Sequence, residues 1–167
     1  MIFKILVIFL FISNLSYSDD KNQLLLHKEQ KKIDTLNLLD ISGQEFSYSS
    51  ETNKVILINF WATWCAPCIK EIPELIQLKK KFKNEIEILF ISVDQNAPKV
   101  VPKFLEKNNL KELTIFNDQN LSIAQSLGVK IMPTTIILNK SFEEISRISG
   151  YINWLDPDSQ KFIENIL

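Results

Sequence analysis

Apolar and polar residues alternate in two short stretches early in the chain and form longer apolar runs further on. The alternation over residues 33–40 and 45–50, with Gly43 between them, predicts a β-hairpin. Residues 55–62 and 86–94 are apolar almost throughout, as is typical of strands covered on both faces. These two runs therefore predict the centre of a sheet.

Helical spacing of apolar residues begins where the first of these runs ends. After Cys65, the residues Ile69, Ile72 and Leu75 fall on one helical face, and Pro73 predicts a kink. The remaining pattern predicts helices over residues 98–109, 120–129 and 157–167, and strands over 113–117, 133–138 and 143–149. Strands that alternate with helices and end in an antiparallel pair predict an α/β fold with a mixed central sheet flanked by helices.

The first 18 residues have the layout of an export signal. Lys4 precedes an apolar run over residues 5–12, and Ser16 and Ser18 follow with the spacing of a signal-peptidase site. The run is shorter than the ~20 residues that span a bilayer. We therefore predict a signal peptide over 1–18, with an uncleaved membrane anchor as the alternative, and location in a bacterial-type periplasm or cell envelope.

Composition fits one ordinary globular domain after this segment. The chain has 167 residues, of which 46% are hydrophobic and 23% charged, enough for a single buried core. We expect a polar lead-in over residues 19–32 and one domain over 33–167. Basic and acidic residues number 19 and 20, and the basic cluster at 79–83 suits a helix end. The charge balance therefore argues against a nucleic-acid partner.

Cys65 and Cys68 are the only cysteines, and they lie where the strand pattern gives way to the helix pattern. A disulfide across two intervening residues restricts the unfolded chain little, so this pair is a poor structural staple. At a helix start, free N–H groups and the helix dipole stabilise a thiolate, lowering the thiol pKa from its usual value of about 8.5. We expect Cys65 to be the exposed nucleophile and Cys68 to resolve the mixed disulfide.

Two other uses of the cysteine pair fit poorly. Zinc takes about four ligands, and the chain offers only His27 in addition, so we expect no metal site. A peroxide-reducing thiol of the peroxiredoxin pattern has threonine where this chain has Ala62. A metallochaperone that binds metal through the two thiolates stays open as a weaker alternative.

The stretch FWATWCAPC, together with MPT at residues 132–134, resembles the thioredoxin superfamily. The pattern CxxCxxEIP over residues 65–73 is similar to its exported TlpA/ResA/CcmG-type branch. The resemblance covers roughly residues 33–167, and residues 97–113 match a central βα insertion of that branch. It implies a thioredoxin-like fold with an N-terminal hairpin, and a redox-active disulfide with no other cofactor.

The resemblance also assigns roles to single residues. Cys65 matches the attacking thiol and Cys68 the resolving thiol. Pro133 matches a cis-proline that leaves backbone groups free to pair with an extended substrate, and a cis bond is inexpensive only before proline. The alternative for Pro133 is an ordinary proline that opens a strand.

Further residues are expected to contact substrate. Met132 would face the sulfur and set substrate preference, and Trp64 would shield the active-site face unless it packs in the core. The other expected contacts are Ala66, Pro67 and Thr134.

The chain departs from ordinary thioredoxins beneath the dithiol. Asn59 stands where they have a buried aspartate, and Phe90 where they have a lysine. Asparagine takes no proton at neutral pH, so we expect Glu71 to replace that aspartate. Glu71 follows Cys68 by three residues, which places both on one helical face. A partly buried carboxylate there would have a raised pKa and exchange protons with Cys68; a solvent-facing glutamate is the alternative.

The resemblance implies an exported thiol-disulfide oxidoreductase that acts on protein thiols and disulfides. Reductases predominate in that branch, including those that keep the haem-attachment cysteines of apocytochrome c reduced, so we expect a reductase. A reductase in an oxidising compartment requires an electron donor, which we expect in the membrane. The alternatives are a disulfide oxidase or isomerase, and a non-catalytic adaptor or chaperone that uses the same groove for binding.

Overall fold

The computed structural model describes residues 24–167. The predicted signal peptide or anchor over residues 1–18 lies outside the described residues. Within 24–167, no helix has the length and apolar character needed to cross a membrane.

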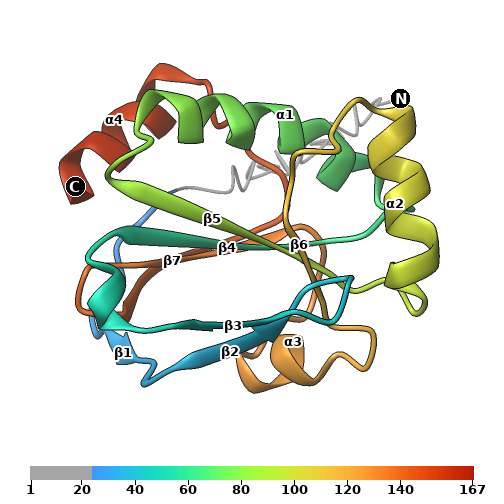
Figure 1. Cartoon of the computed structure of the whole chain (residues 1–167). Helices are drawn as coiled ribbons and strands as arrows, with labels where there is room; N and C mark the ends of the chain where they lie inside the picture. Colours follow the sequence, from blue (N-terminus) through green and yellow to red (C-terminus); the bar gives the residue numbers. More distant parts are fainter. Residues whose placement is uncertain (1–23) are drawn as a thin grey trace, which may run out of the picture.

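A mixed six-stranded sheet forms the centre of the molecule (Figure 1). Its order is β1-β8-β7-β4-β5-β6, and β4 pairs in parallel with β5 and antiparallel with β7. The strands are β1 (Lys31–Lys32), β4 (Val55–Trp61), β5 (Ile86–Ser92), β6 (Ile115–Asn117), β7 (Thr134–Leu138) and β8 (Glu143–Ser149). The two long apolar runs are thus neighbouring central strands, and the predicted fold class is confirmed.

Helices and a separate hairpin cover the two faces of this sheet. The helices are α1 (Ala66–Lys81), α2 (Ala97–Lys107), α3 (Ser122–Ser126) and α4 (Pro157–Ile166), with a short 3₁₀ helix η1 (Ser50–Thr52). Figure 1 shows α1 and α4 on one side of the sheet, and the hairpin with α3 on the other. The sheet is therefore flanked by helices, as predicted.

The predicted N-terminal hairpin is confirmed with shorter strands. Its strands β2 (Leu36–Leu39) and β3 (Glu45–Tyr48) form a two-stranded antiparallel sheet of their own. The rings of Phe46 and Tyr48 meet Phe116 edge-on at 5.4 and 5.9 Å. This contact holds the hairpin against β6.

Two elements differ from the sequence prediction. The lead-in continues along the sheet over residues 24–32: the His27 N–H donates to the Ile145 carbonyl at 2.7 Å, and β1 pairs with β8. The polar side chains of an edge strand carry no apolar alternation, so the pattern did not indicate it. Helix α3 is shorter than residues 120–129, because Leu121 and Gly128, with φ of 59° and 67°, leave the helical region on either side of it.

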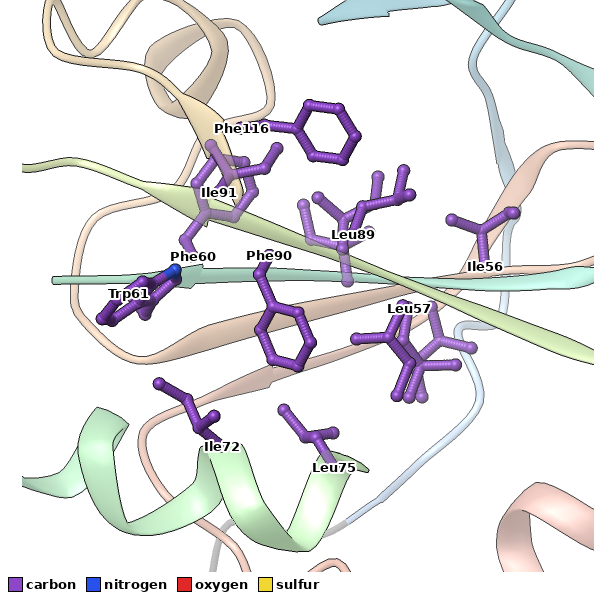
Figure 2. Packing of buried hydrophobic residues seen from close by; sticks show 14 of the residues in the cluster. Ile56, Leu57, Phe60, Trp61, Ile72, Leu75, Leu89, Phe90, Ile91 and Phe116 are labelled. Atoms are coloured by element: carbon purple, nitrogen blue, oxygen red, sulfur yellow. The ribbon is translucent and has the colours of Figure 1, made fainter. Parts of the chain in front are cut away.

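Strand β4 is buried along its whole length, with side chains enclosed on both faces. Figure 2 shows Ile72 and Leu75 of α1 on the side of the sheet where Leu57 and Phe90 point. The alternation of a strand places Asn59, two residues after Leu57, on the same face of β4. The core therefore receives one polar side chain directly beneath α1.

Candidate active site

Cys65 and Cys68 are joined by a disulfide, with their Cα atoms 5.3 Å apart. Cys65 is the N-cap residue of α1, and its carbonyl accepts the N–H of Ile69 at 3.0 Å. Cys68 lies in the first turn of the helix, where N–H groups have no partner within the helix and favour negative charge. The local sequence thus places both sulfurs at the positive end of α1.

The two cysteines differ little in exposure. Cys65 is 6% exposed and Cys68 is fully buried, so the order is as predicted. The expectation of an openly exposed Cys65 is nevertheless wrong, because the bond to Cys68 ties its sulfur to a buried partner. Trp64 beside it is 70% exposed, which also excludes core packing for Trp64. Ala66 and Pro67 are exposed as well, so these three residues form an open surface beside the disulfide.

Hydrogen bonds connect the turn before Cys65 to the residues that follow β5. Asp94 accepts the backbone N–H of Thr63 at 3.0 Å and the Thr63 hydroxyl at 2.7 Å. The hydroxyl of Ser92 donates to the same carboxylate at 2.8 Å. Sequence reasoning did not single out Asp94, whose only signal was an aspartate that closes a buried apolar run.

Glu71 is enclosed, with 1% of its surface exposed, so the solvent-facing alternative is wrong. Its Oε1 accepts from Asn59 Nδ2 at 2.5 Å, and its Oε2 from Trp154 Nε1 at 3.4 Å. Burial raises the pKa of Glu71 to about 7, and these two donors oppose the rise. The carboxyl group can therefore gain and lose a proton near neutral pH, three residues from Cys68 on the same helix.

The surroundings of Glu71 include residues that sequence reasoning missed. Trp154 comes from the loop before α4 and is fully buried. Glu74, one turn after Glu71, accepts the backbone N–H of Trp154 at 3.0 Å and the Tyr151 hydroxyl at 2.8 Å. The helical spacing of Glu71 and Glu74 was visible in the sequence, but Tyr151 and Trp154 lie 77 to 83 residues away from them. Phe90, at the lysine position of thioredoxins, is a buried core residue.

The peptide bond between Met132 and Pro133 is cis, as the resemblance implied. Thr134 pairs with Phe60 across the sheet, so Pro133 lies at the end of β4 that leads into the cysteine turn. The Pro133 carbonyl accepts the Gly150 N–H at 2.7 Å. Among residues 24–167, the backbone of Met132 makes no hydrogen bond, so Met132 rather than Pro133 offers free backbone groups here.

Two further residues named in the sequence analysis can be placed. Thr134 is buried, and its hydroxyl donates to the Ile131 carbonyl at 2.8 Å. His27 contacts Glu144 at 3.1 Å on the far edge of the sheet. No group of three or more potential metal-binding side chains occurs within residues 24–167.

Known proteins match both the sequence and the fold. A family model described as Redoxin matches residues 28–156. The thiol-disulfide oxidoreductase ResA of Geobacillus kaustophilus is 32% identical over 131 residues, which cover 77% of this chain and 72% of ResA. The Redoxin match covers the hairpin, the cysteine pair and the cis-proline.

Solved structures agree on the fold. StoA from Bacillus subtilis superposes with a TM-score of 0.60 at 20% identity, over 76% of this chain and 96% of StoA. A thiol:disulfide interchange protein of the thioredoxin family from Chlorobium tepidum gives 0.68 at 21% identity, over 84% and 98% of the two chains. The fold is therefore thioredoxin-like.

Proposed function

The chain belongs to the Redoxin family, and we propose that it is an exported thiol-disulfide oxidoreductase that reduces disulfides of other proteins. The observation that carries this proposal is the disulfide at the start of α1, which closes only two intervening residues. Such a bond contributes little to stability, whereas its place at the helix N-terminus favours the thiolate that exchange requires.

The reduced pair transfers two electrons in two exchange steps. The Cys65 thiolate attacks one sulfur of a substrate disulfide, that S–S bond breaks, and the other substrate sulfur leaves as a thiolate. Cys68 then loses its proton to Glu71 and attacks the Cys65 sulfur. The mixed disulfide breaks, the second substrate sulfur leaves and takes up a proton, and the Cys65–Cys68 disulfide remains.

The exposed surface around the disulfide supports a protein substrate. Trp64, Ala66 and Pro67 border Cys65 on the open side, and the free backbone of Met132 lies beside the end of β4. An extended substrate segment pairs with that backbone while its disulfide meets Cys65. The chemistry needs no cofactor beyond the cysteine pair.

The sequence features outside the site support the place of the reaction. The apolar segment behind Lys4 supports export to a bacterial-type periplasm or cell envelope. Reduction in an oxidising compartment consumes electrons, so a membrane donor must reduce the Cys65–Cys68 bond after each cycle. Haem-attachment cysteines of apocytochrome c are one substrate class that such a reductase would serve.

The reduction potential of the Cys65–Cys68 couple tests the direction. The protein is equilibrated in redox buffers, and thiols are quantified alongside the fluorescence of Trp64. Reducing couples lie near −270 mV and strongly oxidising couples near −120 mV, a difference of about 7 kcal/mol. A value near the reducing end supports a reductase, and a value near the oxidising end contradicts it in favour of an oxidase or isomerase. Replacing both cysteines by serine without loss of function would instead indicate an adaptor.

A further inference from the structure

Asn59 occupies an unusual position for an amide, in the middle of the buried strand β4. Its Nδ2 donates to Glu71 Oε1 at 2.5 Å and to Thr135 Oγ1 at 3.0 Å, so both of its N–H hydrogens are used. Thr135 lies directly opposite Asn59 on β7. Within residues 24–167, the Asn59 carbonyl oxygen has no hydrogen-bond partner. The amide is therefore fixed by its donors and carries an unused acceptor.

This arrangement suits only one charge state of Glu71. A carboxylate accepts hydrogen bonds and donates none, so the Asn59 amino group must face it. A protonated Glu71 carries an O–H donor. Trp154 Nε1, which only donates, faces Oε2, so the proton of the neutral acid belongs on Oε1, the oxygen that faces Asn59. Two donors would then point at one another.

We propose that Asn59 is a reversible hydrogen-bond partner for Glu71, donating to the charged carboxylate and, with its amide turned over, accepting from the neutral acid. The two ends of an amide have nearly the same shape, so a half-turn about the Cβ–Cγ bond exchanges Oδ1 and Nδ2 without new space. The Thr135 hydroxyl reverses with it, because a hydroxyl both donates and accepts. Either orientation leaves one end of the amide without a partner. Asn59 is thus a positioning residue that acts through Glu71.

The side chain at position 59 determines whether this reversal is available. An aspartate there would place two carboxyl groups at hydrogen-bond distance, and like charges so close share one proton. A leucine of similar size would leave Oε1 without a partner in either state. Of these three side chains, only the amide offers Glu71 both a donor and an acceptor without ionising itself. The inference deepens the proposed function, in which Glu71 takes the proton of Cys68, and it rests on that function.

Nuclear magnetic resonance of the disulfide form tests the inference directly. The carboxyl carbon of Glu71 and the side-chain amide of Asn59 are followed from pH 5 to 9. We expect the Asn59 amide signals to change with the same midpoint as Glu71, and the scalar coupling from its N–H to the Glu71 carboxyl carbon to be present only above that midpoint. A coupling that persists below the midpoint would overturn the proposal, and this test needs no variant to fold.

Variants supply a second readout. Asn59→Leu removes the hydrogen bond to Glu71 in both charge states, and the bond to the charged carboxylate is the stronger one, so the Glu71 midpoint should rise by about one pH unit. Asn59→Asp should produce two coupled titration steps. Asn37→Leu, the same change at an exposed position of β2, should leave the midpoint unchanged. An unmoved midpoint in Asn59→Leu overturns the role of Asn59. Failure of the proposed function would look different. Glu71→Gln would then leave disulfide exchange unchanged, while in the wild-type protein the Asn59 signals would still follow the titration of Glu71.

Discussion

Thr63 binds the carboxylate of Asp94 twice, through its backbone N–H at 3.0 Å and its hydroxyl at 2.7 Å. Thr63 belongs to the turn that connects β4 to α1, and Asp94 follows the end of β5. The pair therefore joins the turn that carries Trp64 and Cys65 to the neighbouring central strand. This half-buried polar contact, together with the start of α1, positions the disulfide.

Replacing Asp94 by alanine should lower the free energy of unfolding by about 2–4 kcal/mol, because three buried or half-buried donors lose their acceptor. Asp94→Asn should cost less, since one carbonyl oxygen remains to accept. Urea denaturation of the disulfide form measures both values. Asp34→Ala, at an exposed position, is the matched control and should stay within about 0.5 kcal/mol. Equal effects at the two positions would contradict this role of Asp94.

The sequence predicted the central strands and α1 well because their signals are local. Residues 55–61 are enclosed on both faces, and a strand in that situation is apolar without alternation. Likewise the start of α1 follows from Cys65, Pro67 and the helical spacing behind them. Strand β1 escaped prediction because an exposed edge strand gains its stability from backbone pairing, which leaves no mark on side-chain polarity.

In the site too, relationships between nearby residues could be predicted, whereas contacts between distant residues could not. Cys68 and Glu71 are three residues apart, so their shared helical face was evident from the sequence. Trp154 and Thr135 reach Glu71 and Asn59 from other elements, at separations of 83 and 76 residues. The spacing of apolar residues along a chain carries no information about contacts between residues so far apart in the sequence. The exposure of Cys65 was also misjudged, because it depends on how deeply its bonded partner is enclosed.

Glu71→Gln should remove one ionisation from the pH dependence of disulfide exchange. In the proposed mechanism ionised Glu71 accepts the proton of Cys68, so the wild-type rate should rise as the pH passes through about 7. The rate of the variant should lack this rise with pH. Above neutral pH the variant should be slower by roughly 100-fold, which is the lower end of the rate enhancement that a general base supplies. Stopped-flow reduction of a model protein disulfide measures the profile. An unchanged profile would dismiss Glu71 as the proton acceptor.

The burial of Glu71 should also make folding stability depend on pH. Its pKa is raised from 4.5 to about 7, so the folded protein holds the proton more tightly than the unfolded chain. The resulting stabilisation is complete below pH 4.5 and is lost as the pH rises to about 7. Over this window, the unfolding free energy should fall by about 3 kcal/mol.

Denaturation of the disulfide form at several pH values checks this expectation, since no thiol then titrates. Glu71→Gln is the control, because it keeps the shape of the side chain and cannot ionise. The difference between wild type and variant should change by about 3 kcal/mol across the window, which removes contributions from other titrating groups. A constant difference would mean that Glu71 is ionised in the folded protein throughout.

Trp64→Ala separates a surface role from a structural one. Trp64 is 70% exposed, so its removal should change the unfolding free energy by less than about 0.5 kcal/mol. The same change should raise the KM for a protein disulfide more than that for a small disulfide such as oxidised glutathione, because only the protein spans the tryptophan. Trp61→Ala is a useful contrast, since Trp61 is fully buried and its loss should destabilise by about 3–5 kcal/mol. Equal KM changes for both substrates would remove Trp64 from the substrate surface.

Single cysteine variants distinguish the attacking from the resolving sulfur. With Cys68→Ser, attack by Cys65 forms a mixed disulfide that has no internal thiol to release it, so substrate proteins should remain bound until an external thiol is added. With Cys65→Ser, the remaining Cys68 is fully buried and should form much less of this complex. Non-reducing electrophoresis after incubation with a disulfide-containing protein measures both. Both sulfurs lie at the start of α1, so the difference in trapping should come from access to the sulfur, which only Cys65 offers at the surface. Equal trapping by the two variants would contradict the assignment of Cys65 as the nucleophile.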